Sequence, residues 1–268
     1  MKKTALTIAG SDPSGGAGIQ ADLKTFHQMG VYGMSVITLI TVQNTRRVEK
    51  VKVLEPEWVG AQLQAVLEDI RPDALKTGAL GSAEVIEAVA ELASGFPGPL
   101  VVDPVMISKH SAPLLDEKGI SALAARLLPL AYLVTPNIHE ASVLAGFSIT
   151  AESDLRRAAQ KIQSLGPQAV LIKGGHFGED ADDILYDGGK FEVYASPRIE
   201  TTQTHGTGCT YSAAITAQLA LGRPLGEAVW VAKKYITEAI ATNPGLGYGM
   251  GPVNHHVRVE EPGPVKEE

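Results

Sequence analysis

The 268-residue chain has one cysteine, no excess of basic residues and no long apolar run. A single cysteine cannot form an internal disulfide, which favours a reducing compartment. The net charge of −7 argues against nonspecific nucleic-acid binding, because that binding needs a basic surface. No apolar run approaches the roughly 20 residues that cross a bilayer, and the N-terminal one is interrupted too early for a signal peptide. These absences predict a cytoplasmic globular protein that binds neither nucleic acid nor membrane.

Hydrophobic residues make up 44% of the chain, enough to bury a full core without disulfides or metals. Apolar β-rich runs alternate with amphipathic helical stretches nearly from end to end. Strands are expected at residues 4–10, 35–43, 74–78, 99–105, 132–137 and 169–175, with a hairpin at 182–196 that turns at Asp187, Gly188 and Gly189. Helices are expected at residues 17–30, 55–70, 82–93, 116–129, 137–146, 151–166, 208–221 and 225–243. The alternation predicts an α/β fold, a three-layer α/β/α sandwich with a mostly parallel central sheet.

The chain shows no internal repeat and no linker-like break in composition, so a single domain over residues 1–254 is predicted. Residues 255–268 are charged and contain proline, and we expect them to form a flexible C-terminal tail.

Polar or glycine-rich residues follow nearly every predicted strand. Ligands of parallel sheets bind at the carboxyl ends of the strands, so these exits together outline one site. The exits are Gly10 to Asp12, Gln43 to Thr45, Lys76 to Gly78, Asp103 to Val105, Pro136 with Asn137, and Lys173 to Gly175.

Two glycine loops compete as the phosphate-binding loop. Residues 16–21 are similar to a dinucleotide fingerprint, but the loop from Gly10 is too long and the next strand ends in Gln43 rather than an acidic residue. A glycine turn that closes over a small ligand fits this loop better. The second loop, Gly206 to Cys209, precedes an alanine-rich helix, where backbone amides and the helix dipole favour an anion. A helix start with glycines for packing is the alternative.

Seven motifs, in order, cover nearly the whole chain: AGSDPSGGAGIQADLKTF, TVQNT, VVDPVM, TPNIHEA, LIKGGH, HGTGCTYSAAI and GPVNHH. Together they resemble the hydroxymethylpyrimidine/phosphomethylpyrimidine kinases of thiamine biosynthesis, a branch of the ribokinase-like superfamily. The resemblance implies ATP-dependent phosphorylation of 4-amino-5-hydroxymethyl-2-methylpyrimidine, and then of its monophosphate to the diphosphate. It also implies a ribokinase-like fold, Mg²⁺ and a homodimer.

On the nucleotide side, the resemblance assigns Asn137 and Glu140 to the ordering of Mg²⁺ and its waters, and places Asp103 near the same region. The alternative for Asn137 and Glu140 is an N-cap with a first-turn glutamate. Lys173, at a strand end beside two glycines, can neutralise charge on the transferring phosphoryl group. Lys233 matches a family lysine that approaches the nucleotide, although a solvated helix lysine is the alternative. The loop residues Gly206, Thr207 and Gly208 complete the predicted phosphate site.

On the substrate side, we expect Gln43 to recognise the pyrimidine, because a terminal amide offers an acceptor and two donors to an aminopyrimidine edge. A glutamine that faces solvent is the alternative. The resemblance implies that Gly10, Ala17 and Val105 line the ring, and Asp12 is assigned to the same site. The seven histidines are expected to be structural or surface residues, apart from a lid contact by His110.

Cys209 stands where many ribokinase-like enzymes carry a catalytic aspartate. We expect the helix N-terminus to lower the pKa of this thiol, so that Cys209 takes the proton of the substrate alcohol. A weakly ionised thiol also repels a phosphomonoester less than a carboxylate does. The alternative is a small buried residue that packs the helix start.

Ala79 departs from the family, because relatives often carry methionine there against the pyrimidine. A wider pocket raises the alternative of a pyridoxine or pyridoxal kinase. A non-catalytic ligand-binding relative is a third hypothesis. The presence of Asp103, Asn137, Glu140, Lys173 and residues 206–209 together counts against it.

Overall fold

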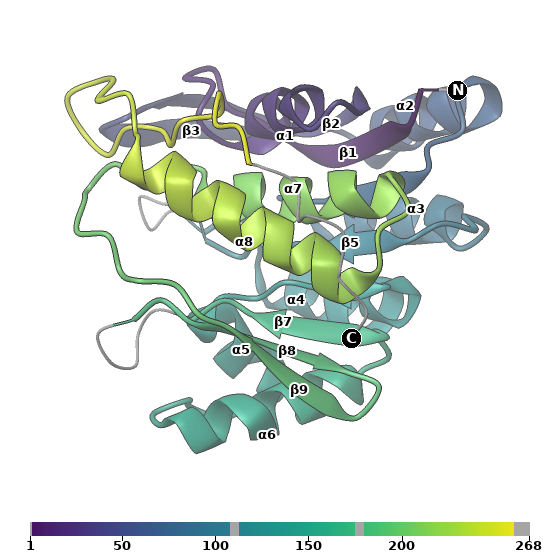
Figure 1. The fold of residues 1–268 in the computed structure, drawn as a ribbon. Coiled ribbons are helices and arrows are strands. Elements are labelled where there is room, and N and C mark those ends of the chain that lie inside the picture. Colours follow the sequence, from purple (N-terminus) through teal and green to yellow (C-terminus); the bar gives the residue numbers. More distant parts are fainter. Residues whose placement is uncertain (1, 108–112, 175–179, 260–268) are drawn as a thin grey trace.

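The structure, a computed structural model, describes residues 2–107, 113–174 and 180–259. Its strands are β1 (Thr4–Ser11), β2 (Tyr32–Asn44), β3 (Arg47–Val53), β4 (Ala74–Thr77), β5 (Leu100–Val102), β6 (Leu133–Val134), β7 (Ala169–Ile172), β8 (Asp183–Asp187) and β9 (Lys190–Tyr194). They form one sheet in the order β3-β2-β1-β4-β5-β6-β7-β8-β9 (Figure 1). The inner strands pair in parallel, and the antiparallel pairs are β2–β3, β7–β8 and β8–β9. The predicted mostly parallel sheet is confirmed.

Helices cover both faces of the sheet (Figure 1). One face carries α1 (Gly18–Gln28), α7 (Thr207–Ala220) and α8 (Leu225–Ala241), and the other carries α2 (Pro56–Asp69), α3 (Ala83–Ala93), α4 (Glu117–Ala122), α5 (Ile138–Ala145) and α6 (Glu152–Gln163). Alternate strand residues supply the two cores: in β5, Leu100 and Val102 pack toward α2–α6, whereas Val101 packs toward α7 and α8. The predicted three-layer sandwich is therefore confirmed.

Strand β1 is the point where the strand order changes direction. It pairs in parallel with β2 on one side and with β4 on the other, so the chain builds the sheet outward from β1 both ways. The carboxyl ends of strands flanking such a point leave a crevice that is open to ligands. The glycine loop after β1 lies at this crevice.

Two local elements differ from the predictions. Strand β3 was not predicted; its charged, mostly exposed sequence RVEKVKV has no apolar pattern, and its pairing with β2 makes it a strand. The helix predicted at 116–129 is α4 followed by a π-helical turn, Leu123–Leu127, and a 3-10 turn, Leu128–Leu130. Pro129 lacks the N–H that an α-helix needs at this position, which explains the tightened end.

The C-terminal segment packs farther than predicted. His255 and Val257 are buried. Tyr235 donates its hydroxyl to the carbonyl of His255 (2.9 Å), and Gln28 donates its amide to the carbonyl of Val257 (2.9 Å). The domain therefore extends at least to Val257, beyond the predicted boundary at residue 254. Residues 260–268 of the expected tail lie outside the described residues.

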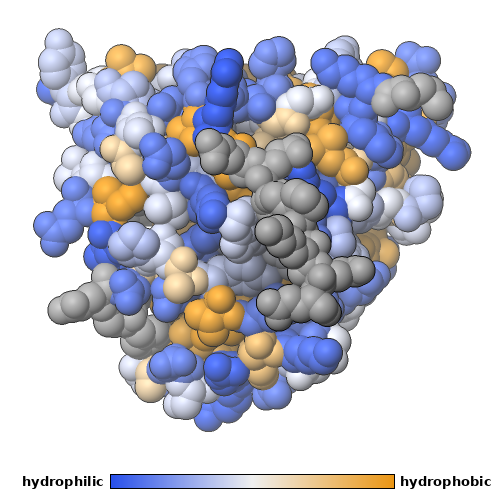
Figure 2. All heavy atoms as spheres, viewed as in Figure 1, coloured by the Kyte–Doolittle hydropathy of each residue, from blue (hydrophilic) through white to orange (hydrophobic). Residues whose placement is uncertain are grey.

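The face drawn in Figure 2 is mostly hydrophilic, with its apolar residues in separate small groups. Scattered apolar residues of this kind are ordinary on a globular surface. Among the described helices, none combines the length and apolar character that a membrane span requires.

Candidate active site

A cavity of about 1050 Å³ opens at the carboxyl ends of the parallel strands. It collects the predicted site residues that fall in the described chain, and Ala79 with them: Gly10, Asp12, Ala17, Gln43, Asp103, Val105, Asn137, Glu140, Lys173, Gly206, Thr207, Gly208, Cys209 and Lys233. His110, predicted as a lid contact, lies outside the described residues. Strand ends from distant parts of the sequence thus line one pocket, as expected from the binding of ligands at the carboxyl ends of parallel strands.

The two glycine loops contact each other at the N-terminus of α7. Gly206 has φ of +79°, and a Cβ there would collide with the carbonyl oxygen of Gly16. Glycine is therefore required at position 206 for both its backbone conformation and its close approach. A Cβ on Gly208 would lie 3.4 Å from Nζ of Lys173 and 3.8 Å from Oδ2 of Asp103. The α7 N-terminus thus lies beside a fixed cation.

Lys173 and Asp103 form an ion pair inside the cavity, with Nζ and Oδ1 2.8 Å apart. Thr135 and Ser212 also donate hydroxyl hydrogens to the Asp103 carboxylate, at 3.3 Å and 3.2 Å. Burial raises the pKa of Asp103, but Lys173, Lys76 and the hydrogen bond from Ser212 together outweigh that effect and leave the pKa lowered. Burial lowers the pKa of Lys173, and Asp103 and Glu140 together outweigh that effect and leave the pKa raised. Both groups are charged at neutral pH, so Lys173 presents a positive charge to the pocket.

Asn137 and Glu140 form a capping box at the start of α5. Asn137 Oδ1 accepts from the Glu140 amide (2.9 Å), and Glu140 Oε2 accepts from the Asn137 amide (2.8 Å). The capping alternative raised from the sequence is therefore realised, and one oxygen of Glu140 is engaged in it. Burial raises the pKa of Glu140 to about 7, with Lys173 opposing the rise and Asp103 adding to it.

Lys233 reaches the same cavity from α8 but is held by a carboxylate. Its Nζ lies 2.8 Å from Oδ2 of Asp183, and it also donates to the carbonyl of Ala181. The other oxygen of Asp183 accepts from the amide of Gly174 at the end of β7 (2.8 Å). The solvated-lysine alternative is wrong, since Lys233 is buried. Asp183 was missed from the sequence because it reads as an ordinary strand-start residue in the hairpin.

Cys209 lines the cavity as a half-buried thiol in the first turn of α7. Burial raises the pKa of this thiol to about 11, against a lowering effect of Lys76. The expectation of a lowered pKa is therefore wrong, because burial outweighs the lowering effects of Lys76 and of a hydrogen bond with the Gly18 backbone. At neutral pH the group is a thiol, not a thiolate.

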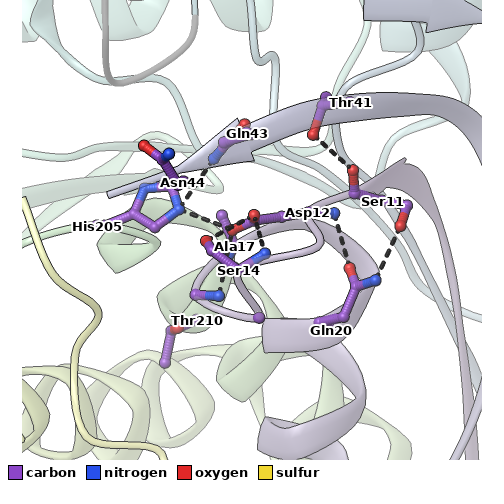
Figure 3. A network of polar contacts seen from close by, with 12 residues as sticks. Ser11, Asp12, Ser14, Ala17, Gln20, Thr41, Gln43, Asn44, His205 and Thr210 are labelled. Carbon is purple, nitrogen blue, oxygen red and sulfur yellow. Dashed lines mark hydrogen bonds and ion pairs between the residues drawn. The ribbon is translucent and has the colours of Figure 1, made fainter. Parts of the chain in front are cut away.

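Directly before the N-terminus of α7, His205 joins the two glycine loops to β2 (Figure 3). Its Nε2 lies 2.7 Å from Oδ2 of Asp12 and 3.1 Å from Nε2 of Gln43. The Asp12 carboxylate also accepts from the amides of Ser14, Gly16 and Ala17 at 2.9, 3.2 and 2.9 Å. His205 is a site residue that the sequence prediction missed, although it directly precedes Gly206. The Asp12 carboxylate therefore stabilises the glycine loop through these hydrogen bonds and does not point freely into the pocket.

Lys76 is a strand-exit residue that does not line the cavity. Its side chain is completely buried, and its Nζ lies 2.8 Å from Oδ2 of Asp22 in α1. A Cβ on Gly78, which lines the cavity, would lie 3.4 Å from this ammonium. The cation therefore stands directly behind the pocket wall.

The chain is similar to several known proteins. The model of the phosphomethylpyrimidine kinase family matches residues 12–254. The thiamine biosynthesis bifunctional protein ThiED of Geobacter sulfurreducens is 51% identical over 96% of this chain, which spans about half (53%) of that longer protein. The hydroxymethylpyrimidine/phosphomethylpyrimidine kinase of Streptomyces coelicolor is 48% identical, with 93% of each chain covered.

Among solved structures, an ADP complex of Bacillus subtilis pyridoxal kinase is similar, with a TM-score of 0.88 and 42% identity over 95% of this chain and 98% of that one. This likeness confirms the predicted ribokinase-like fold. Because the family match covers nearly the whole described domain, the chain belongs to the phosphomethylpyrimidine kinase family.

Proposed function

We propose that this chain transfers the γ-phosphoryl group of ATP to 4-amino-5-hydroxymethyl-2-methylpyrimidine, and then to its monophosphate, in thiamine biosynthesis. The observation that carries the proposal is the shared cavity of Gln43, the Lys173–Asp103 pair and the Gly206–Gly208 loop. A side chain that can recognise a heterocycle, Gln43, and a site that can bind an anion thus line the same cavity. The kinase name of the Streptomyces coelicolor relative supports the same reaction, and the name of the Geobacter sulfurreducens relative supports a place in thiamine biosynthesis.

The nucleotide side of the proposed site is built from backbone amides and two lysines. The amides of Gly206 and Gly208 donate hydrogen bonds to phosphate oxygens at the start of α7, where the helix dipole also favours an anion. The amide of Thr207, between them, donates to the carbonyl of Thr204 (3.3 Å). Lys173, raised in pKa and fixed by Asp103, stabilises charge on the transferring group. Lys233, oriented by Asp183, contributes a second positive charge from α8.

The metal of the proposed reaction is Mg²⁺, held through Asp103 and Glu140 with Asn137 beside them. Among residues 2–107, 113–174 and 180–259, no cluster of three or more His, Cys, Asp or Glu residues is placed to hold a metal by itself. Two carboxylates fit Mg²⁺ nonetheless, because this ion is usually bound by one or two carboxylates together with substrate phosphates and water. When bound, it neutralises charge that develops on the phosphates.

The acceptor side is proposed to hold the pyrimidine between Gly10, Ala17 and Val105, with Gln43 at its edge. Cys209 is placed in this proposal against the acceptor group. The oxygen of the acceptor forms the new bond to the γ-phosphorus while the bond from that phosphorus to the β-phosphate oxygen breaks and ADP leaves. With the alcohol as acceptor, the hydroxyl proton passes to solvent; the monophosphate has no hydroxyl proton to lose from its attacking oxygen. The transition state of phosphoryl transfer is loose, so the attacking hydroxyl needs little activation and a neutral thiol beside it is compatible with turnover.

A pyridoxal-type kinase is the second candidate function. Ala79 lines the cavity, which is therefore wider there than it would be with a methionine. A solved pyridoxal kinase also shares the fold over most of both chains. The alternative predicts a faster reaction with pyridoxal than with the pyrimidine alcohol.

One assay tests both functions: coupled detection of ADP with ATP and Mg²⁺ and with the pyrimidine alcohol, its monophosphate or pyridoxal as acceptor. We expect turnover with the alcohol and the monophosphate, and little with pyridoxal. Preference for pyridoxal would support the second candidate. No turnover with any acceptor would instead support a non-catalytic relative.

We also propose a cytoplasmic homodimer. Ile40 and Val42 of β2 are 47% and 52% exposed, alternate with cavity-lining residues, and therefore share the face directed away from the cavity. Lys52 and Lys50 of β3 pair with them in register. Two exposed apolar side chains flanked by lysines on this face of the sheet suit contact with a second copy. Light scattering after size-exclusion chromatography, with the Ile40→Lys and Val42→Lys variants, tests the dimer.

A further inference from the structure

His205 is held rigidly from three directions. Its amide donates to the carbonyl of Gly251 (3.0 Å), and its carbonyl accepts from the amide of Val253 (3.3 Å). Its ring packs on the first glycine loop, since a Cβ on Gly16 would lie 2.5 Å from Cδ2 of the imidazole. The side chain is buried, and its position is therefore set by the backbone rather than by any ligand.

The Asp12 carboxylate determines whether Nε2 of the His205 ring carries a hydrogen. Burial raises the pKa of Asp12, but hydrogen bonds from His205 and Ser14 outweigh it and leave the pKa lowered. The carboxylate is therefore ionised at neutral pH and only accepts hydrogen bonds. With Oδ2 of Asp12 2.7 Å from Nε2, that ring nitrogen must carry the hydrogen.

A protonated Nε2 cannot accept a hydrogen bond from Gln43. The amide nitrogen of Gln43 stands 3.1 Å from this donor in the structure (Figure 3). The two ends of a glutamine amide are nearly identical in shape, so the hydrogen-bond network decides which end lies where. Turning the amide places its oxygen toward Nε2–H, which Asp12 and Gln43 then share. The amino group then lies on the far side from the imidazole, available to the cavity that Gln43 lines.

We propose that His205 is a positioning residue for substrate recognition: its Nε2–H, fixed by Asp12, selects the Gln43 orientation that presents the amino group to the ligand. The ligand edge that meets Gln43 is then a hydrogen-bond acceptor, such as a ring nitrogen of the pyrimidine. This inference rests on the proposed function for the identity of the ligand, but not for the state of the ring. It also gives the GPVNHH motif a role, because Gly251 and Val253 fix the His205 backbone.

The state of the ring is tested on the parent protein by ¹⁵N NMR of labelled histidine, with His205→Gln used to assign the signals. We expect a protonated Nε2 for His205 at neutral pH. An unprotonated Nε2 would overturn the proposal, whatever the enzyme's activity.

The coupling is tested by calorimetric titration of the pyrimidine alcohol into the parent, His205→Leu, Gln43→Ala and the double variant. If His205 acts through Gln43, each single change weakens binding on the order of tenfold. The double variant then binds no more weakly than Gln43→Ala. Independent, multiplying losses would overturn the proposal.

Two further variants separate positioning from general damage. His205→Gln keeps an N–H donor near the place of Nε2, and we expect it to retain most of the affinity that His205→Leu loses. His27→Gln changes an exposed histidine of α1 and serves as the matched control. A parent that does not bind the pyrimidine would refute the proposed substrate, and the NMR result would then decide the inference alone.

Discussion

Lys76 and Asp22 form an ion pair in which both side chains are completely buried, with Nζ and Oδ2 2.8 Å apart. Thr7 donates its hydroxyl to the same carboxylate oxygen (2.6 Å). Burial lowers the pKa of Lys76, but Asp22 and other nearby acidic groups together outweigh that effect and leave the pKa raised. Burial also raises the pKa of Asp22, and Lys76 and Thr7 only partly offset this rise. The 2.8 Å contact between Nζ and Oδ2 has the geometry of an ion pair, and we treat the two groups as such. The pair joins β4 to α1 behind the cavity wall at Gly78.

Lys76→Met should destabilise the fold by about 3–5 kcal/mol, because it leaves the Asp22 carboxylate buried without its cation. Urea unfolding followed by circular dichroism measures the change. Lys161→Met, at an exposed site on α6, is the control and should change stability little. A loss below about 1 kcal/mol would mean that the pair contributes little to folding.

The raised pKa of Cys209 predicts how the reactivity of its thiol depends on pH. Iodoacetamide reacts with the thiolate, so alkylation of the native protein should be slow at pH 7–8, as is expected from a pKa of about 11, and should accelerate as pH rises toward that value. In urea the midpoint should fall to about 8.5, the value of a free thiol. Cys209 is the only cysteine, so mass spectrometry gives the rate directly. A native midpoint below the denatured one would restore the thiolate expected from the helix N-terminus.

Two substitutions of Cys209 distinguish a neutral thiol from a general base. For Cys209→Ala we expect both phosphorylation steps to slow by a similar factor, because a neutral group serves both acceptors alike. Loss of a base would instead slow the alcohol step alone by about 10²–10⁴-fold.

For Cys209→Asp we expect the monophosphate step to suffer selectively, by about tenfold or more, because a carboxylate repels the phosphomonoester. Separate initial rates with the two acceptors measure all of these effects. An aspartate variant that handles the monophosphate as well as the alcohol would contradict this account of the site.

Glu140→Gln should raise the Mg²⁺ concentration needed for half-maximal rate by about 10-fold to 100-fold. The glutamine oxygen can still accept from the Asn137 amide, so the capping box of α5 and the thermal stability should be largely kept. Initial rates over a Mg²⁺ series test this, with Glu152→Gln in the exposed first turn of α6 as the control. An unchanged Mg²⁺ dependence would leave Glu140 as a capping residue only.

Much of the fold could be predicted from the chain because its signals are local. Apolar β-rich runs and amphipathic stretches place β1, β2 and α1–α3 within a few residues of their bounds, and alternation predicts their parallel pairing. Strand β3 carries no such signal, since its exposed charged residues become a strand only by pairing with β2. The interrupted helix after α4 depends on Pro129, whose effect on the helix end was not anticipated.

The candidate site divides in the same way. The sequence by itself determined which residue types stand at the strand exits and that Gly206 opens a helix, since these are properties of neighbouring residues. Only the tertiary structure decided that His205 is held by Asp12, that Lys76 turns inward to Asp22, and that Asp183 holds Lys233. It also decided the state of Cys209, because a thiol's pKa depends on how much water and charge surround it. Each of these relationships joins residues far apart in the chain, and burial sets its strength.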